Sequence, residues 1–374
     1  MKKVLLAALA IAAMASCAKN EPAVQLQQSD SPISFLPVVG NSTKATYLTT
    51  INMEDNCQDF GVFAWMTTNE FDLEYASASV FMNNVKVSYK DGDFISDETG
   101  TGAWFPETSY YWPNNKKLTF DAYAPADLGS GVRVTSNNTT GLKISDYTVS
   151  SNLATQQDLL YTKDRSKDKT TNKDGAPTGG KYDGVDLNFK HALSAIEIYA
   201  RNADVTGGAD GIKITSVKII NAYNKGTFTQ NYENGVLPTA GDAAKWDISA
   251  SATEESYTVF DGSSTPISVP YQAEAIKIGD NAILMPQGLS HSGSNNVSLV
   301  VSYKVRTDGS EYAAMDDVTI DISNAAIKGE SGNITSWDIN KRYIYTLVFD
   351  LDKIFFAPIV ADWDTVTAAD ITIK

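Results

Sequence analysis

Apolar and polar residues alternate along much of the chain from about residue 60 onward. Three long runs show this pattern, over residues 118–124, 297–305 and 343–351. Side chains of a β-strand point alternately to its two faces, so this alternation is typical of strands with one buried face. Turn-forming pairs such as Asn114-Asn115 and Asp308-Gly309 separate the runs. Many short strands joined by turns predict an all-β protein whose antiparallel sheets bury their apolar faces against each other.

A length of 374 residues is typical of two domains rather than one. Hydrophobic residues make up 43 % of the chain, which is enough for well-packed cores. The longest strongly polar stretch without alternation covers residues 163–184 and is expected to be a loop or linker. We therefore expect two tandem antiparallel β-sandwich domains of Greek-key, transthyretin-like arrangement, over residues 45–184 and 185–374.

The N-terminal segment has the layout of a secretory signal. Two lysines precede an apolar run over residues 4–15, which is too short to cross a bilayer of ~30 Å as a helix. Cys17 ends a stretch that resembles a bacterial lipobox. We therefore expect residues 1–16 to be removed and Cys17 to carry the acyl chains that anchor the precursor to a membrane. The alternative is an ordinary signal peptide followed by an incidental cysteine.

Charge and composition argue against several classes of function. The formal net charge is −15, whereas nucleic acids and anionic lipids are bound through basic surfaces. Two histidines and two cysteines leave few ligands for a soft metal ion and few pairs of nucleophile and base. We therefore predict no nucleic-acid partner, no cofactor, no metal site and no catalytic activity.

The residues that could suggest a reactive site are better explained as structural. His191 continues the alternation of the preceding apolar residues, so it is expected in the core. His291 stands among serines in a loop-like segment that lacks a positioned acid and a nucleophile elbow. Asp91 and Asp93 flank a glycine, which is typical of a hairpin turn rather than of a glycosidase pair. Cys57 has no histidine nearby in the sequence and is expected to be a structural thiol.

Seven short motifs follow one another along the chain: Phe60-Gly61-Val62-Phe63-Ala64-Trp65, Tyr110-Tyr111-Trp112-Pro113, Leu118-Thr119-Phe120-Asp121-Ala122-Tyr123, Asp158-Leu159-Leu160-Tyr161, residues 185–194, Leu284-Met285-Pro286-Gln287, and residues 342–347. In this order they resemble the fimbrillin family of pilins, known from Bacteroides and Porphyromonas. The resemblance extends from about residue 33 to residue 374. It implies a β-sandwich subunit of a cell-surface fimbrium that serves adhesion.

The resemblance also implies a route of assembly. Pilins of this family reach the outer membrane as lipoproteins, and a trypsin-like protease then cuts them after a basic residue. The lost N-terminal strand leaves a groove that a strand of another subunit fills. Here the matching cut lies between Lys44 and Ala45, at the end of a leader over residues 17–44 that contains a strand-like segment, residues 33–39. The family often has arginine at the cut, and the alternative is that Lys44 is only a basic residue in a flexible leader.

The C-terminal segment is the expected donor of the replacing strand. Apolar residues occur at strand-like spacing over residues 354–360 and alternate again over residues 367–373. A terminal strand has a free end, so it can leave its own domain and enter the groove of a neighbour. The candidate donor side chains are those of Ile354, Phe356, Ile359, Ile371 and Ile373. The alternative is that these strands complete the second sandwich.

The sequence also supports a second class of function. Aromatic residues cluster at residues 104–105 and 110–112, and exposed aromatic rings stack on sugars. Packing in the core is the competing explanation. The alternative to a fimbrial subunit is therefore a lipid-anchored surface glycan-binding protein of a polysaccharide uptake system. A glycan binder would stay monomeric and keep its leader, whereas a fimbrial subunit would lose residues up to Lys44 and polymerise.

Overall fold

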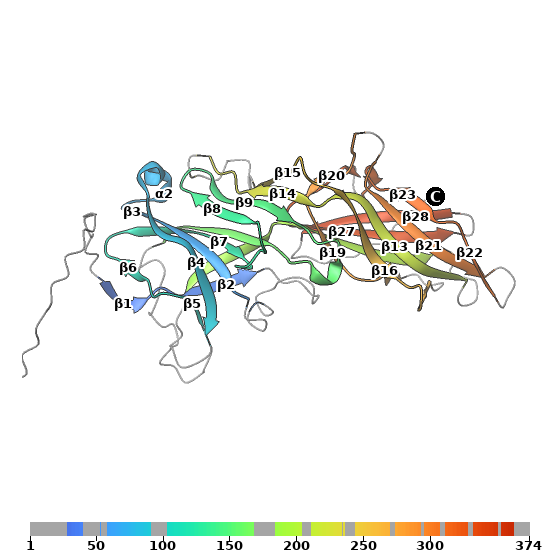
Figure 1. Cartoon of the computed structure of the whole chain (residues 1–374), viewed down its shortest axis with the longest axis horizontal. Coiled ribbons are helices and arrows are strands. Elements are labelled where there is room, and N and C mark those ends of the chain that lie inside the picture. The colour runs from blue at the N-terminus through green and yellow to red at the C-terminus, as the bar shows by residue number, and fades with distance from the viewer. Residues whose placement is uncertain are drawn as a thin grey trace, which may run out of the picture.

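The computed structural model describes residues 28–39, 53, 58–90, 103–167, 184–203, 211–233, 235, 244–269, 274–292, 295–306, 311–327, 332–350 and 353–362. Figure 1 shows an elongated molecule, with one β-rich half built from the N-terminal segments and the other from the C-terminal segments. Helical structure in the described part is short: α2 (Phe71–Glu74) and the 3-10 helices η1 (Tyr75–Ser77) and η2 (Leu153–Thr155). The predicted all-β class is confirmed.

Seven strands of the N-terminal half form a closed barrel in the order β10-β11-β2-β5-β4-β3-β7. Their bounds are β2 (Phe35–Val39), β3 (Phe60–Thr67), β4 (Ser79–Lys90), β5 (Ala103–Pro106), β7 (Lys117–Ala124), β10 (Leu160–Lys167) and β11 (Val185–His191). Neighbouring strands are antiparallel except β2 and β11, which are parallel. Closure is a feature that the sequence did not predict. It arises because the short β2 joins β5 to β11, so neither of them is an edge.

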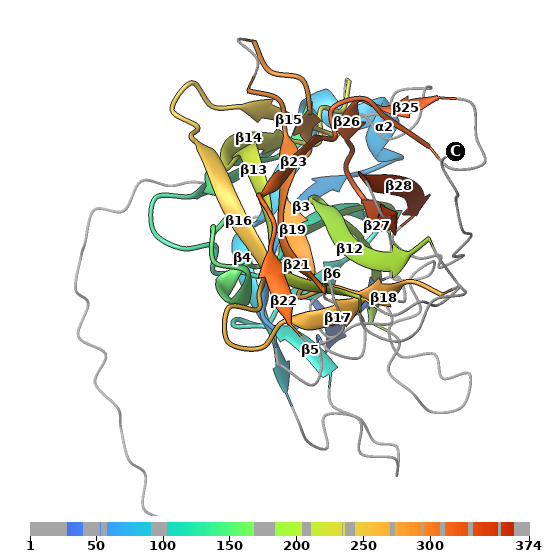
Figure 2. The same cartoon turned by 90° about the vertical axis from the view of Figure 1, so that its right-hand side faces the viewer.

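Two sheets of the C-terminal half pack face to face, as Figure 2 shows along the long axis. One has the order β18-β12-β27-β28, with β19 also on β12, and the other has the order β16-β13-β21-β22, with β17 on β13 and β23 on β21. The bounds are β12 (Ser194–Asn202), β13 (Ile212–Tyr223), β16 (Glu254–Asp261), β17 (Ile267–Val269), β18 (Ile276–Lys277), β19 (Ala282–Leu284), β21 (Ser298–Arg306), β22 (Tyr312–Ala314), β23 (Val318–Asp321), β27 (Lys341–Asp350) and β28 (Lys353–Asp362). Buried residues of both sheets, such as Ile198 and Val217, belong to one hydrophobic cluster. This half is the predicted β-sandwich, with one parallel pair, β12 and β27.

A third sheet connects the two halves. It consists of β8 (Arg133–Asn137), β9 (Gly141–Thr148), β14 (Lys225–Thr229) and β15 (Lys245–Ile248), in the order β15-β14-β9-β8. Segments from both sides of residue 184 therefore share one sheet. In addition, β11 begins at the expected start of the second domain but pairs inside the barrel. The domain boundary between residues 184 and 185 stays a prediction. The two halves are joined by the third sheet and by the pairing of β11 in the barrel as well as by the connecting chain.

The remaining strands are short pairs: β1 (Gln28–Pro32) with β6 (Tyr111–Pro113), β20 (Gln287–Gly288) with β26 (Ser336–Trp337), and β24 (Ala325–Ala326) with β25 (Asn333–Ile334). Of the three long alternating runs of the sequence, residues 118–124, 298–305 and 343–350 lie in β7, β21 and β27. β7 is buried on both faces, since Leu118 and Phe120 belong to the barrel core and Tyr123 to the cluster of the second half. None of the helices in the described part is both long enough and apolar enough to cross a bilayer.

Candidate functional site: the groove that holds β2

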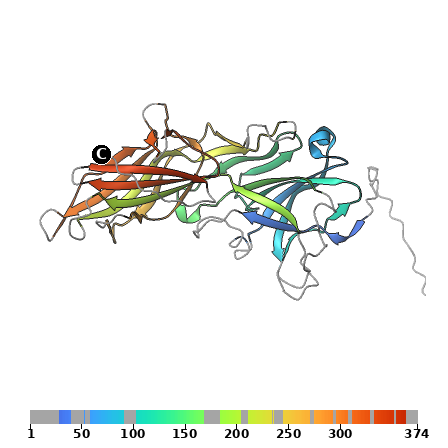
Figure 3. The same cartoon turned by 180° about the vertical axis from the view of Figure 1, so that it is seen from behind.

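β2 closes the barrel wall between β11 and β5, and Figures 1 and 3 show it from opposite sides. It pairs with β11 over its five residues, beginning with Phe35 opposite Val185. Toward β5 it has one register pair, Phe35 opposite Trp104. Just before the strand, the carbonyl of Ser34 accepts a hydrogen bond of 2.8 Å from the backbone N–H of Val185. Among the described residues, the pairing with β11 is thus the one that extends along all of β2.

Alternate side chains around β2 point into the barrel. Ile33, Phe35 and Val39 are at most 2 % exposed and Pro37 is also buried, whereas Leu36 is 38 % exposed. Burying an apolar side chain of this size contributes about 1.5–3 kcal/mol relative to leaving it in water. Loss of residues 33–39 would thus open an apolar slot and would leave backbone N–H and C=O groups of β11 and β5 without partners. An added strand satisfies both needs at once.

The wall of this slot is aromatic. The ring of Phe35 lies edge-on to Phe60 and Phe120, with ring centroids 6.0 and 5.5 Å apart. Phe60 in turn contacts Trp104 at 5.3 Å and Phe189 at 5.7 Å. Edge-to-face aromatic pairs add to the stabilisation that burial provides. The slot is therefore complementary to a strand with a large apolar side chain at the position of Phe35.

Gly184 permits the close approach of β2 to the start of β11. A Cβ atom at residue 184 would lie 2.7 Å from the carbonyl carbon of Phe35, which is closer than real Cβ contacts. Glycine is the residue that allows such proximity between two backbones. The slot is thus shaped for a strand backbone at this point, whichever chain supplies it.

The predicted processing sites belong to the leader that carries β2. Cys17, Lys44 and Ala45 lie outside the described residues, so lipidation and cleavage stay predictions. β1, which pairs with β6, also lies in the leader. A cut after Lys44 would therefore remove both β1 and β2 from the subunit.

The first predicted donor segment forms the edge of its own sheet. β28, which contains Ile354, Phe356 and Ile359, pairs antiparallel with β27 over all ten of its residues. Ile371 and Ile373 lie outside the described residues. In this structure β28 is part of the second sandwich, which is the alternative stated above. Its transfer to a neighbouring subunit stays a prediction.

His191 lies in the core, as its place in the alternation predicted. Its side chain is 1 % exposed, and its Nδ1 atom lies 2.9 Å from Oδ2 of Asp158. Its backbone N–H donates to Oδ1 of Asn340 at 3.3 Å. The sequence did not predict the partner Asp158, although this residue opens one of the seven motifs. The pair connects the segment before β10 to the end of β11, so its role is to hold the barrel together.

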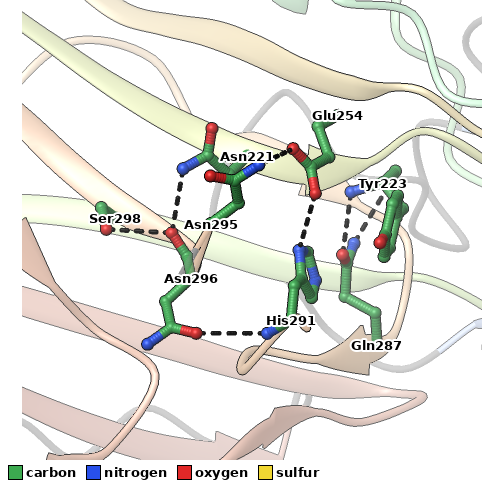
Figure 4. A network of polar contacts seen from close by, with 8 residues as sticks. All are labelled: Asn221, Tyr223, Glu254, Gln287, His291, Asn295, Asn296 and Ser298. Atoms are coloured by element: carbon green, nitrogen blue, oxygen red, sulfur yellow. Dashed lines mark hydrogen bonds and ion pairs between the residues drawn. The ribbon is translucent and has the colours of Figure 1, made fainter. Parts of the chain in front are cut away.

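His291 takes part in the polar network shown in Figure 4. Its ring stacks on Tyr223 with centroids 4.2 Å apart, and its Nδ1 atom lies 3.4 Å from Oε1 of Glu254. Its backbone N–H donates to Asn296 at 3.2 Å, and Asn295 donates to Glu254 at 3.2 Å. The sequence did not predict the carboxylate beside this histidine. The contacts fix the loop before β21 against β13 and β16.

The two tryptophans of the N-terminal aromatic clusters are core residues, whereas Phe105, Tyr110 and Tyr111 are partly exposed. Trp104 is 1 % exposed and Trp112 is fully buried, so neither offers a flat surface to a sugar. In the other half, the hydroxyl of Tyr345 on β27 accepts a hydrogen bond of 3.0 Å from the indole N–H of Trp337, and burial raises the pKa of this tyrosine. Within the described ranges, no group of three or more His, Cys, Asp or Glu side chains is placed to hold a metal ion.

Comparison with known proteins agrees with this geometry. A family model described as fimbrillin-like matches residues 43–363. The chain belongs to the fimbrillin-like family. This fimbrillin-like chain is similar in fold to the crystal structure of a fimbrial protein from Bacteroides vulgatus, with 17 % identity and a TM-score of 0.60 over 88 % of this chain and 99 % of that one. A candidate cell adhesion protein from Bacteroides uniformis is 17 % identical, with a TM-score of 0.47 over 90 % of this chain and 100 % of that one. No curated protein sequence matches significantly.

The extent of the family match bears on the groove. The matched residues of the fimbrillin-like chain include β11, β5 and β28 but leave out β1 and β2. The part of the chain common to the family thus contains the slot and the strand at the C-terminal edge. The strand that fills the slot here comes from the segment before the match.

Proposed function

We propose that the chain is a structural subunit of a cell-surface fimbrium, that it serves adhesion, and that it has no catalytic activity. The observation that carries this proposal is β2: a strand outside the family match closes the barrel, and together with Ile33 just before it buries four apolar side chains there. Its removal would create a groove that fits a strand of a neighbouring subunit. Membership of the fimbrillin-like family and the fold shared with a fimbrial protein support the same role.

In this proposal the groove is opened by processing. The precursor is exported as a lipoprotein anchored in the outer membrane through Cys17. A trypsin-like protease cuts after Lys44 and removes the leader with β1 and β2. The C-terminal segment of a neighbouring subunit, with the candidates Ile354, Phe356, Ile359, Ile371 and Ile373, then fills the slot. The burial of Trp104 and Trp112 weakens the case for the alternative glycan-binding function, because these two rings of the aromatic clusters cannot stack on a sugar.

Lys44→Ala tests this proposal. The variant should keep its leader, fold with β2 in place and fail to accept a neighbour's strand, since the slot stays occupied. Mass spectrometry of material sheared from the cell surface reports the mature N-terminus, and electrophoresis of unheated samples reports polymers. Lys19→Ala, in the same leader, is the matched control and should be processed and polymerise normally. Normal fimbriae built from Lys44→Ala subunits that begin at Cys17 would contradict the proposal.

A further inference from the structure

Two segments at opposite ends of the chain share a pattern. Residues 33–39 read Ile-Ser-Phe-Leu-Pro-Val-Val, and residues 354–360 read Ile-Phe-Phe-Ala-Pro-Ile-Val. The first, third, fifth and seventh residues are identical, and the second, fourth and sixth all differ. Identity at every other position is the pattern expected when one face of a strand must fit one surface.

The identical positions are the ones that the barrel buries. Ile33, Phe35, Pro37 and Val39 are all buried in the groove of β2. Of the positions between them, Leu36 is 38 % exposed, and the other segment has Ala357 there; Ser34, which precedes β2, is also buried, and the other segment has Phe355 there. Within β2, the repeat therefore keeps the buried residues Phe35, Pro37 and Val39 and changes the exposed Leu36.

The same four residues hold the corresponding places in β28. The register pairs Ile354 with Phe349, Phe356 with Leu347, Pro358 with Tyr345 and Val360 with Tyr343. These four residues of β27 are all buried. Directly opposite residues of an antiparallel pair lie on the same face of the sheet, so the repeated positions share a face with these buried residues of β27. One strand face thus suits two surfaces of this molecule.

The shared proline makes the match more specific. Proline has no backbone N–H and is confined to edge strands or to places where no donor is needed. In the slot, Pro37 belongs to the short strand β2, whose described register pair with β5 is at Phe35. β28 meets this condition at Pro358 because β28 is the last strand of its sheet. Proline at the same place in both strands is therefore a further feature that the two segments share.

We infer that β28 of a second copy of this chain replaces β2 in the same register, parallel to β11, with Ile354, Phe356, Pro358 and Val360 in the places of Ile33, Phe35, Pro37 and Val39. This inference rests on the proposed function and goes beyond it in naming the partner, the direction and the register. Of the donor candidates, Ile354 and Phe356 enter the slot, whereas Ile359 belongs to the opposite face.

The proposed register also determines which exposed residues of the two copies lie opposite each other. In the precursor, exposed Leu36 lies opposite exposed Asp186 of β11. In the polymer, Ala357 of the second copy takes the place of Leu36. Neighbouring strands lie ~4.8 Å apart, which is within the Cα separation of disulfides. A cysteine at each position should therefore form a disulfide between two copies without disturbing the buried face.

The experiment uses two differently tagged full-length chains that are coexpressed in a cell without the wild-type gene. One carries Asp186→Cys and the other Ala357→Cys, and both carry Cys57→Ser so that the mature subunits hold no other thiol. A second pair replaces Ala357→Cys with Ile359→Cys, which shifts the register by two residues. A Lys44→Ala chain that carries both Leu36→Cys and Asp186→Cys tests whether cysteines at these two opposite positions of β2 and β11 form a disulfide within one molecule. Oxidised fimbriae are separated by non-reducing electrophoresis.

We expect a disulfide-linked dimer with both tags from the 186 and 357 pair, and a loss of most of this band from the 186 and 359 pair. Polymers that cross-link better through 186 and 359 would overturn the register. Polymers that cross-link through neither pair would overturn β28 of this chain as the occupant and leave the proposed function standing. If the wild type polymerises but the Cys57→Ser parent does not, the cysteine pairs are tested in a Cys57→Ala parent instead. If the wild type itself does not polymerise, the proposed function is overturned, and this inference with it.

Discussion

Phe35 is the leader residue whose ring reaches Phe60 and Phe120 in the barrel core. In a Lys44→Ala precursor, which retains β2, Phe35→Ala should lower the free energy of unfolding by about 3–5 kcal/mol, because a buried ring is lost and a cavity remains. Leu36→Ala is the matched control at a more exposed position and should change it by about 0.5 kcal/mol or less. Urea unfolding measures both values. Equal losses of unfolding free energy in the two variants would contradict the placement of Phe35 inside the barrel and of Leu36 outside it.

For single residues, the sequence predicted which side chains are buried better than it predicted which residues they contact. Alternation alone identified His191 as a core residue. Its neighbour Asp158 could not be predicted, because the contact depends on the pairing of β10 with β11, which sets Leu160 opposite His191. A periodic pattern determines which face of a strand is buried, but it carries no information about which residue of another strand lies opposite.

At the scale of elements, the close approach of β2 to Gly184 makes a second prediction. Gly184→Ala places a Cβ atom 2.7 Å from the carbonyl carbon of Phe35, so β2 must shift. We expect the Lys44→Ala precursor with this change to lose about 1–3 kcal/mol of stability. Gly288→Ala, where an added Cβ meets nothing within 4 Å, is the control and should cost less. Thermal and urea unfolding compare the two. A Gly184→Ala precursor as stable as the control would show that the backbones have room to separate.

The elements themselves were largely predictable, and their neighbours were not. Strands were expected over residues 118–124, 343–351 and 33–39, and the structure has β7, β27 and β2 over residues 117–124, 341–350 and 35–39. The parallel pairing of β2 with β11, the closure of the barrel and the sheet that joins β9 to β14 were not expected. These features depend on contacts between segments far apart in the chain. The repeat between residues 33–39 and 354–360 is visible in the sequence, but its meaning needed the burial of β2.

At the scale of the whole molecule, the slot and its proposed occupant lie in different halves. Figure 1 places β2 in the N-terminal half and β28 in the C-terminal half. A strand that passes from one half of a subunit to the other half of the next makes a heterologous contact, and such contacts repeat without closing when no rotation returns the chain to its start. The arrangement therefore favours a linear filament in which each subunit gives one strand and receives one.

Because each subunit gives one strand and receives one, we can predict how an unprocessed subunit behaves in a mixture with processed subunits. A Lys44→Ala subunit keeps β2 in its own slot, so it cannot accept a strand, but its β28 can still enter the slot of a processed neighbour. It should therefore occupy one end of a filament and stop growth there. When it is coexpressed with wild type, mean fimbrial length in electron micrographs should fall as its share rises, and an antibody to the leader should label a single end. Lys19→Ala subunits, which are processed, should leave the length unchanged. Leader label along the shaft, or unchanged length at a high share of Lys44→Ala, would show that a subunit can be incorporated without vacating its slot.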